Sequence, residues 1–260
     1  MSYEGIKALN WSSLKHLAVS PLHYKYRQEH KEKSKPAYVI GGATHTRILE
    51  PALFDSRYGV FDGTRKGKEW DAWLAANPGK ESIKPPELAT IDAMAKMVRE
   101  HRVASTLITG GRYEQTIEWV DAATGIKCKG RVDYIKPDSL VDLKTAPAIG
   151  KRDSALAAGK FLYHAQLAWY LDGAVASGAL PADAAARIIF LQKAPPYDVA
   201  VRRLNNVDLA IGRAIMRHLL NRYAECTEAD YWPGIAPDEE ELNAPEWSAD
   251  MTMEQESEDF

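Results

Sequence analysis

The chain has 260 residues, of which 45% are hydrophobic and 27% charged, and its formal net charge is −3. This length and composition allow a substantial core, and we expect a single α/β domain. The chain has two cysteines, Cys128 and Cys226, which excludes a four-cysteine iron–sulfur site, and nothing in the sequence indicates zinc. It has neither a long apolar run nor an apolar signal core. We therefore expect a cytoplasmic protein without disulfides or membrane spans.

Charge is distributed unevenly along the chain. Residues 223–260 contain thirteen acidic residues and no Lys or Arg, which leaves 33 basic and 23 acidic residues in positions 1–222, a balance of +10. A basic body suits a phosphate backbone, although a solvated surface is the ordinary explanation. We expect a domain at 1–237 and an acidic, disordered tail at 238–260, which keeps the protein soluble, competes with DNA for the basic region or docks a partner.

The first half of the chain is predicted to be largely helical. Apolar spacing predicts an amphipathic helix over 11–28, capped by Asn10 or Ser12, and another helix over 87–103. A basic run ending at Lys31, Lys33 and Lys35 leads to a helix around His45, and a short strand is expected at 57–61. The Gly- and Pro-rich segment 61–86 is predicted to be a loop, either mobile and near DNA or a plain connector.

The second half is predicted to alternate strands and helices. Strands are expected at 115–120, 127–136, 140–145 and 186–192, and helices at 160–172 and 207–223. The turn formers at 136–139 join two of the strands into a hairpin. Strands followed by a helix that crosses to a later strand predict a mixed central sheet flanked by helices.

The hairpin carries the residues most suggestive of chemistry. Side chains two apart on a strand share a face, so Asp142 and Lys144 point the same way, and Asp133 can meet them across the hairpin. Carboxylate oxygens hold Mg²⁺ against a phosphate, and a lysine beside the metal orients water or steadies developing charge. The alternative is an exposed ion pair on an ordinary hairpin, but the apolar neighbours Val141 and Leu143 predict a buried strand end, where charged groups are rare.

Several ordered motifs extend the hairpin pattern over nearly the whole chain. They are Leu9-Asn10-Trp11-Ser12-Ser13-Leu14, residues 40–51 around His45, Arg65-Lys66-Gly67-Lys68-Glu69-Trp70, Gly130-Arg131-Val132-Asp133, Val141-Asp142-Leu143-Lys144-Thr145, residues 163–170 with Gln166 and Tyr170, and Tyr231-Trp232-Pro233-Gly234. Together they resemble the PD-(D/E)XK nuclease superfamily. More narrowly, they resemble the phage-type exodeoxyribonuclease VIII (RecE-like) family, which is related to the RecB nuclease domain and lambda exonuclease.

The resemblance implies a role for each matching residue. His45 corresponds to the family's metal-associated histidine, Asp133 and Asp142 to its acidic ligands, and Lys144 to its catalytic lysine. Asp142 replaces the commoner glutamate, and this shorter carboxylate still ligates magnesium. Gln166 and Tyr170, one helical turn apart, match the family's Gln-x-x-x-Tyr helix. Without the resemblance, His45 reads as a hydrogen-bonded core residue, and Gln166 and Tyr170 as part of a packed helix.

The resemblance also implies a fold and an activity. The fold is α/β, a restriction-endonuclease-like mixed sheet flanked by helices. The activity is a Mg²⁺-dependent exodeoxyribonuclease, with Mn²⁺ able to substitute, that digests one strand of linear duplex DNA from its ends, 5′ to 3′, to leave single strands for recombination. Its implied partners are double-stranded DNA ends, further copies in a homo-oligomeric ring, and a single-strand annealing protein. The alternatives are an endonuclease of the same fold and a non-catalytic DNA-binding module.

Additional residues are predicted to contact DNA. Ser12, Lys15 and Ser20 lie near a predicted helix start, where hydroxyls and backbone N–H groups receive a terminal phosphate, although serines there are usually caps. Further candidates for contacts with the DNA backbone are the basic residues Arg65, Lys66 and Arg131.

Overall fold

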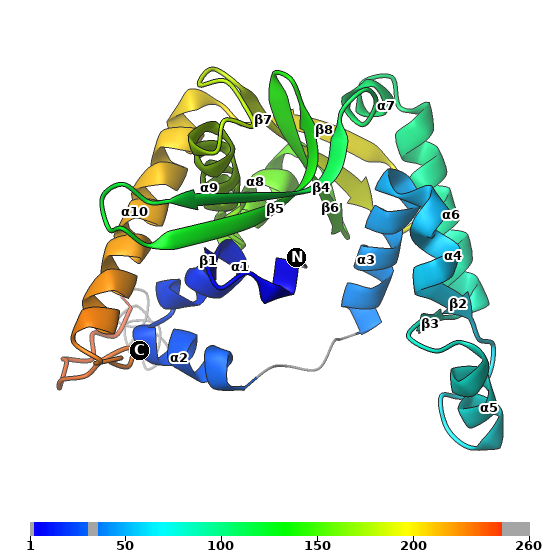
Figure 1. Ribbon diagram of the computed structural model, residues 1–260, viewed down its shortest axis with the longest axis horizontal. Helices are drawn as coiled ribbons and strands as arrows, with labels where there is room; N and C mark the ends of the chain where they lie inside the picture. The colour runs from blue at the N-terminus through cyan, green and yellow to red at the C-terminus, as the bar shows by residue number, and fades with distance from the viewer. Residues whose placement is uncertain (1–2, 31–35, 246–260) are drawn as a thin grey trace, which may run out of the picture.

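A mixed sheet of six strands forms the centre of the protein (Figure 1). The computed structural model describes residues 3–30 and 36–245. The strands of the sheet are β1 (Leu9–Asn10), β4 (Arg112–Val120), β5 (Lys127–Lys136), β6 (Ser139–Ala146), β7 (Ala185–Gln192) and β8 (Val199–Arg203). They follow the order β1-β5-β6-β7-β8, with β4 also paired to β5, and the β1–β5 and β6–β7 pairs are parallel. The predicted mixed sheet is therefore confirmed.

Helices cover both faces of this sheet. On one face, α9 (Tyr163–Ala176) buries Leu167 and Leu171 against Ile135 and Ile188. On the other face, α3 (Pro36–Leu49) and α6 (Pro85–Glu100) pack around Tyr134, Val141 and Ile189. In the view of Figure 1, α9 and the long α10 (Asn206–Glu228) lie on the left, and α3 and α6 lie on the right.

Shorter elements complete the described chain. They are η1 (Tyr3–Gly5), α1 (Trp11–Leu14), η2 (Lys15–Ala18), α2 (Pro21–Glu29), η3 (Pro51–Leu53), α4 (Phe54–Arg57), β2 (Tyr58–Val60), α5 (Lys68–Ala76), β3 (Glu81–Ile83), α7 (Ala104–Leu107) and α8 (Lys151–Lys160). Strands β2 and β3 form a separate parallel pair.

Strand β5 forks away from β6, and this fork positions the site. Cys128 pairs with Trp119 of β4 on one edge and with Leu9 of β1 on the other. Further along β5, strand β6 takes the place of β1 on the same side. It pairs with β5 only at the end of the hairpin, from the Tyr134–Val141 pair to the Lys136–Ser139 pair. Residues 130–133 of β5 therefore lie in the opening between β1 and β6, with β4 alone beside them.

Two predicted elements need correction. The helix predicted over 11–28 is broken, because Pro21 disfavours a helical conformation at Ser20, whose φ of −171° and ψ of 160° are extended. Ser20 instead caps α2, and Asn10 caps α1 as predicted. The loop predicted over 61–86 contains α5 and β3, and rings from Phe61, Trp70 and Trp73 pack against one another there.

The remaining sequence predictions on organisation are met in part. The strands expected at 127–136, 140–145 and 186–192 and the helices at 87–103 and 207–223 are confirmed within a few residues at each end. Both cysteines are buried free thiols. Among the described helices, none is long and apolar enough to cross a membrane. Lys31, Lys33, Lys35 and residues 246–260 lie outside the described residues, so the acidic tail stays a prediction.

Candidate active site

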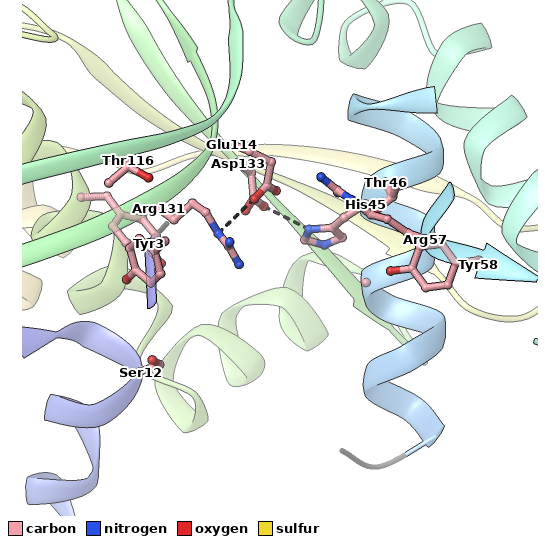
Figure 2. Close-up of a pocket in the computed structure, with 12 residues that line it drawn as sticks. Tyr3, Ser12, His45, Thr46, Arg57, Tyr58, Glu114, Thr116, Arg131 and Asp133 are labelled. Atoms are coloured by element: carbon pink, nitrogen blue, oxygen red, sulfur yellow. Dashed lines mark hydrogen bonds and ion pairs between the residues drawn. The ribbon is translucent and has the colours of Figure 1, made fainter. Parts of the chain in front are cut away.

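Three potential metal ligands meet at the fork between β5 and β6. His45 of α3, Glu114 of β4 and Asp133 of β5 each offer a ligand atom within 4.8 Å of the other two. They line an open cavity of about 570 Å³, together with Tyr3, Ser12, Arg57 and Arg131. Figure 2 shows Glu114 and Asp133 at the centre of this cavity, with Arg131 approaching from one side and His45 from the other.

Asp133 is held in place by the strand from which β5 diverges. Its Oδ2 atom accepts a hydrogen bond from the backbone N–H of Leu143, at 2.7 Å, and lies 3.5 Å from Nδ1 of His45. The side chain is 15% exposed. A carboxylate anchored by one backbone donor keeps lone pairs available, so Asp133 can bind a cation from the cavity side.

His45 reaches this carboxylate because α3 approaches the sheet closely. A Cβ atom added to Gly42 would lie 3.3 Å from the Tyr58 hydroxyl, and one added to Gly41 would lie 4.0 Å from Oγ1 of Thr145. Gly42 therefore packs tightly against Tyr58 of β2, and Gly41 faces Thr145 of β6 at ordinary contact distance. His45 faces the cavity rather than the core, with 26% of its side chain exposed.

Glu114 was not predicted from the sequence. It faces Asp133 in the β4–β5 register, between the Tyr113–Tyr134 and Gln115–Val132 pairs, and its φ of 48° interrupts regular pairing. Burial raises the pKa of Glu114, and the neighbouring charge of Asp133 raises it further. Two carboxylates that repel each other in a half-buried site mark a candidate cation site, since a bound cation would relieve their repulsion.

Asp142 and Lys144 form a buried ion pair on β6. Asp142 is 2% exposed, and Nζ of Lys144 lies 2.5 Å from its Oδ2 atom. The angles of this contact do not give Oδ2 a well-aligned hydrogen bond from any described residue. Burial raises the pKa of Asp142 to about 6, with the Asp133 charge also raising it and Lys144 opposing the shift. Burial lowers the pKa of Lys144, but Asp142 and Asp133 outweigh burial and raise it overall.

These residues fit a hard divalent cation. The donors at the fork are mainly carboxylate oxygens, which Mg²⁺ and Mn²⁺ prefer, with one imidazole nitrogen. Asp142 adds a further carboxylate beside them, and its Oδ2 atom is engaged by Nζ of Lys144. The structure thus brings the predicted His45 and Asp133 together and adds Glu114. Asp142 and Lys144 lie near enough for the charges of Asp133 and His45 to act on Asp142, but neither residue lines the cavity.

Of the two predicted helix residues, Gln166 and Tyr170, only Tyr170 lines the cavity. Nε2 of Gln166 donates to the Tyr170 hydroxyl over 3.2 Å. Burial raises the pKa of Tyr170, so it stays protonated and can donate a hydrogen bond. A Cβ atom on Gly130 would lie 2.9 Å from the Tyr170 ring, which gives the glycine of the Gly-Arg-x-Asp motif a packing role.

The residues predicted to contact DNA fall in different places. Ser12 lines the cavity. Burial lowers the pKa of Lys15, and the positive charge of Lys144 lowers it further. Ser20 is 3% exposed and its hydroxyl accepts from the His23 N–H, which is the capping alternative. Arg65 donates to Ser82 and contacts Glu87, away from the cavity, while Lys66 is exposed.

The fold and this site define the class of protein. A mixed sheet with a histidine, carboxylates and a lysine gathered at its fork is the arrangement of a nuclease-like domain of the PD-(D/E)XK superfamily. The chain belongs to the family described as "PDDEXK-like domain of unknown function (DUF3799)", which matches residues 10–242.

Other comparisons add a likeness in fold. The chain is similar to the crystal structure of a "Putative exonuclease" from Eubacterium rectale, with a TM-score of 0.64 and 12% sequence identity over 97% of this chain and 98% of that one. At this identity the likeness shows a common fold. No curated protein matches the sequence.

Proposed function

We propose that this protein is a metal-dependent deoxyribonuclease that hydrolyses phosphodiester bonds at the fork between β5 and β6. The observation that carries this proposal is the meeting of His45, Glu114 and Asp133 within 4.8 Å of one another, beside a buried aspartate–lysine pair. This arrangement is not expected in an ordinary surface hairpin, because burying several carboxylates together lowers the stability of the fold.

The residues divide the work between binding and charge stabilisation. Asp133, Glu114 and His45 would hold the cation, with Asp142 adjacent. When bound, a divalent cation polarises a phosphoryl oxygen and lowers the pKa of water. Lys144 stays charged because its carboxylate neighbours raise its pKa, so it donates hydrogen bonds to the phosphate or to the attacking water and does not act as a base. Tyr170 donates a further hydrogen bond from the cavity wall.

The finer activity follows from the resemblance to the exodeoxyribonuclease VIII family. We propose digestion of one strand of linear duplex DNA from its ends, 5′ to 3′, with Mg²⁺ as the natural cation and Mn²⁺ as a substitute. The single strands produced would serve recombination in the cytoplasm, with a ring of identical subunits and an annealing protein as partners. The basic balance of residues 1–222 supports DNA as the substrate.

The test compares linear and covalently closed circular duplex DNA in Mg²⁺, with wild type and Lys144→Ala side by side. We expect wild type to degrade the linear DNA, to leave the circle intact, and to stop when the cation is chelated. Lys144→Ala, checked for folding by circular dichroism, should leave both intact. Cleavage of the circle would favour an endonuclease, and linear DNA that is bound but never cut would favour a non-catalytic module.

A further inference from the structure

An arginine ties one of the proposed cation ligands to the wall of the cavity. Nε of Arg131 lies 3.1 Å from Oε2 of Glu114, and Arg131 also lies 3.9 Å from Oε1 of Glu4. Its guanidinium carbon is 5.0 Å from the centre of the Tyr3 ring. Arg131 remains 47% exposed and lines the cavity, and Figure 2 shows its guanidinium extending toward Glu114.

Arg131 and a divalent cation compete for the same carboxylate. Glu114 belongs to the group of three mutually close ligands, so a cation bound there draws on its negative charge. The guanidinium beside it is then repelled by the added positive charge and loses part of its attraction to Glu114. Arg131 has another attractive partner at hand when a phosphate enters the cavity, since guanidinium groups bind phosphate oxygens in a bidentate manner.

We propose that Arg131 is a phosphate-positioning residue whose release from Glu114 is coupled to cation binding. Without a cation, Arg131 is held by Glu114 and binds DNA weakly. With a cation, Arg131 is freed to hold a phosphate of the DNA backbone beside the site of cleavage. The competition between Arg131 and a cation depends on Glu114 and Arg131 alone. The binding of a DNA phosphate by the freed Arg131 rests on the proposed function.

A second arginine in the cavity provides a matched control. Arg57 also lines the cavity, and its side chain is 46% exposed. Its two terminal nitrogens contact Glu50 at 2.6 and 3.2 Å, and Glu50 lies outside the group of three ligands. A cation at the fork therefore does not compete with Arg57 for its partner. Each arginine carries one positive charge, but of the two only Arg131 contacts one of the three ligands.

The size of the coupling follows from the exposure of the pair. With 47% of Arg131 and 26% of Glu114 exposed, their ion pair is a partly solvated one. Such pairs alter equilibria by about two- to fivefold, and by linkage the effect on cation binding equals the reciprocal effect on Arg131.

The first experiment measures Mn²⁺ binding by calorimetry in the absence of DNA. Removal of the competitor should make Arg131→Met bind Mn²⁺ about two- to fivefold more tightly than wild type. Arg57→Met, which removes the same charge without touching a ligand, should show a clearly smaller change. Equal tightening in both variants, or none in Arg131→Met, would overturn the proposal.

The second experiment measures binding of a short DNA duplex by fluorescence anisotropy in EDTA. Glu114→Gln should bind the duplex about two- to fivefold more tightly than wild type, because Arg131 is already free. The gain should disappear once Arg131 is absent, so Glu114→Gln/Arg131→Met should bind the duplex no more tightly than Arg131→Met. A gain that persists in this comparison reflects general charge removal and refutes a role for Arg131. The proposed function is tested separately. If wild type leaves linear DNA intact in the Mg²⁺ digestion, the nuclease proposal fails, whatever the binding experiments show.

Discussion

Replacement of Lys144 by methionine tests the buried pair on β6 through stability rather than activity. In the wild type, burial holds the pKa of Asp142 at about 6, and the Lys144 charge keeps it from rising further. Methionine preserves much of the side-chain volume but removes that charge. We expect the pKa of Asp142 in Lys144→Met to reach 7 or above, so the buried carboxyl stays protonated at neutral pH.

The expected loss follows from proton linkage. Because the pKa of Asp142 is higher in the folded protein than its ordinary value of 3.8, the folded protein binds more protons than the unfolded chain between these two values. The free energy of unfolding therefore falls as pH rises from about 4 to the folded-state pKa. In the wild type the fall stops near pH 6, whereas in the variant it continues to pH 7, a difference of about 1.4 kcal/mol. At pH 5 Asp142 is largely protonated in both folded proteins, and the difference nearly disappears.

Urea unfolding at pH 5 and pH 7 measures this effect without metal or DNA. The loss of stability in Lys144→Met should be about 1.4 kcal/mol greater at pH 7 than at pH 5. The double variant Asp142→Asn/Lys144→Met has no titrating carboxyl there and so also lacks the wild-type fall in stability, and its loss relative to wild type should therefore be smaller at pH 7 than at pH 5. In Lys144→Met, a loss of equal size at both pH values, or a larger loss at pH 5, would refute the reasoning.

Three other substitutions test contacts at the site and elsewhere in the fold. Gly130→Ala should lower stability by about 1–3 kcal/mol by urea unfolding, since its Cβ would lie 2.9 Å from the Tyr170 ring, and near-zero loss would contradict that packing. Arg217→Met should cost about 1 kcal/mol at pH 7, because hydrogen bonds from the partly exposed Arg217, together with those from Thr124, lower the pKa of Asp121 to about 2. This depressed pKa gives stability that is present above about pH 4, so the Arg217→Met loss should shrink as pH falls toward 2. Ser20→Ala should cost about 1 kcal/mol by removing the cap of α2, with DNA affinity unchanged if Ser20 serves as a cap alone.

The central part of the fold was predictable because its signals are local. Alternating residues at 127–136 and 140–145 separated by turn formers specify a hairpin, and the structure joins β5 to β6 through Pro137 and Asp138. The break at Ser20-Pro21 was missed by the helix predicted over 11–28, although its signal is local, since a serine before proline favours an extended cap over helix continuation. The dense glycines and prolines at 61–86 hid α5, whose residues are all at least partly exposed.

Glu114 could not be predicted, because its importance arises from contacts distant in sequence. It precedes the strand expected at 115–120, a position where an exposed glutamate is ordinary. The structure begins β4 at Arg112, and the β4–β5 register then places Glu114 opposite Asp133. The ion pair of Glu114 with Arg131 depends on the same register. Asp133 was placed near Asp142 by the hairpin pattern itself, whereas His45 was found because the resemblance supplied the long-range information that periodicity lacks.

The most direct measurement of the central claim is anomalous diffraction from crystals of wild type soaked in Mn²⁺. We predict an anomalous peak within coordination distance of Asp133 and Glu114, with His45 beside it, and no such peak in crystals of Asp133→Asn. A saturating soak that leaves this cavity without a peak, or that places Mn²⁺ on other residues, would contradict the assignment of a cation site and the nuclease mechanism built on it.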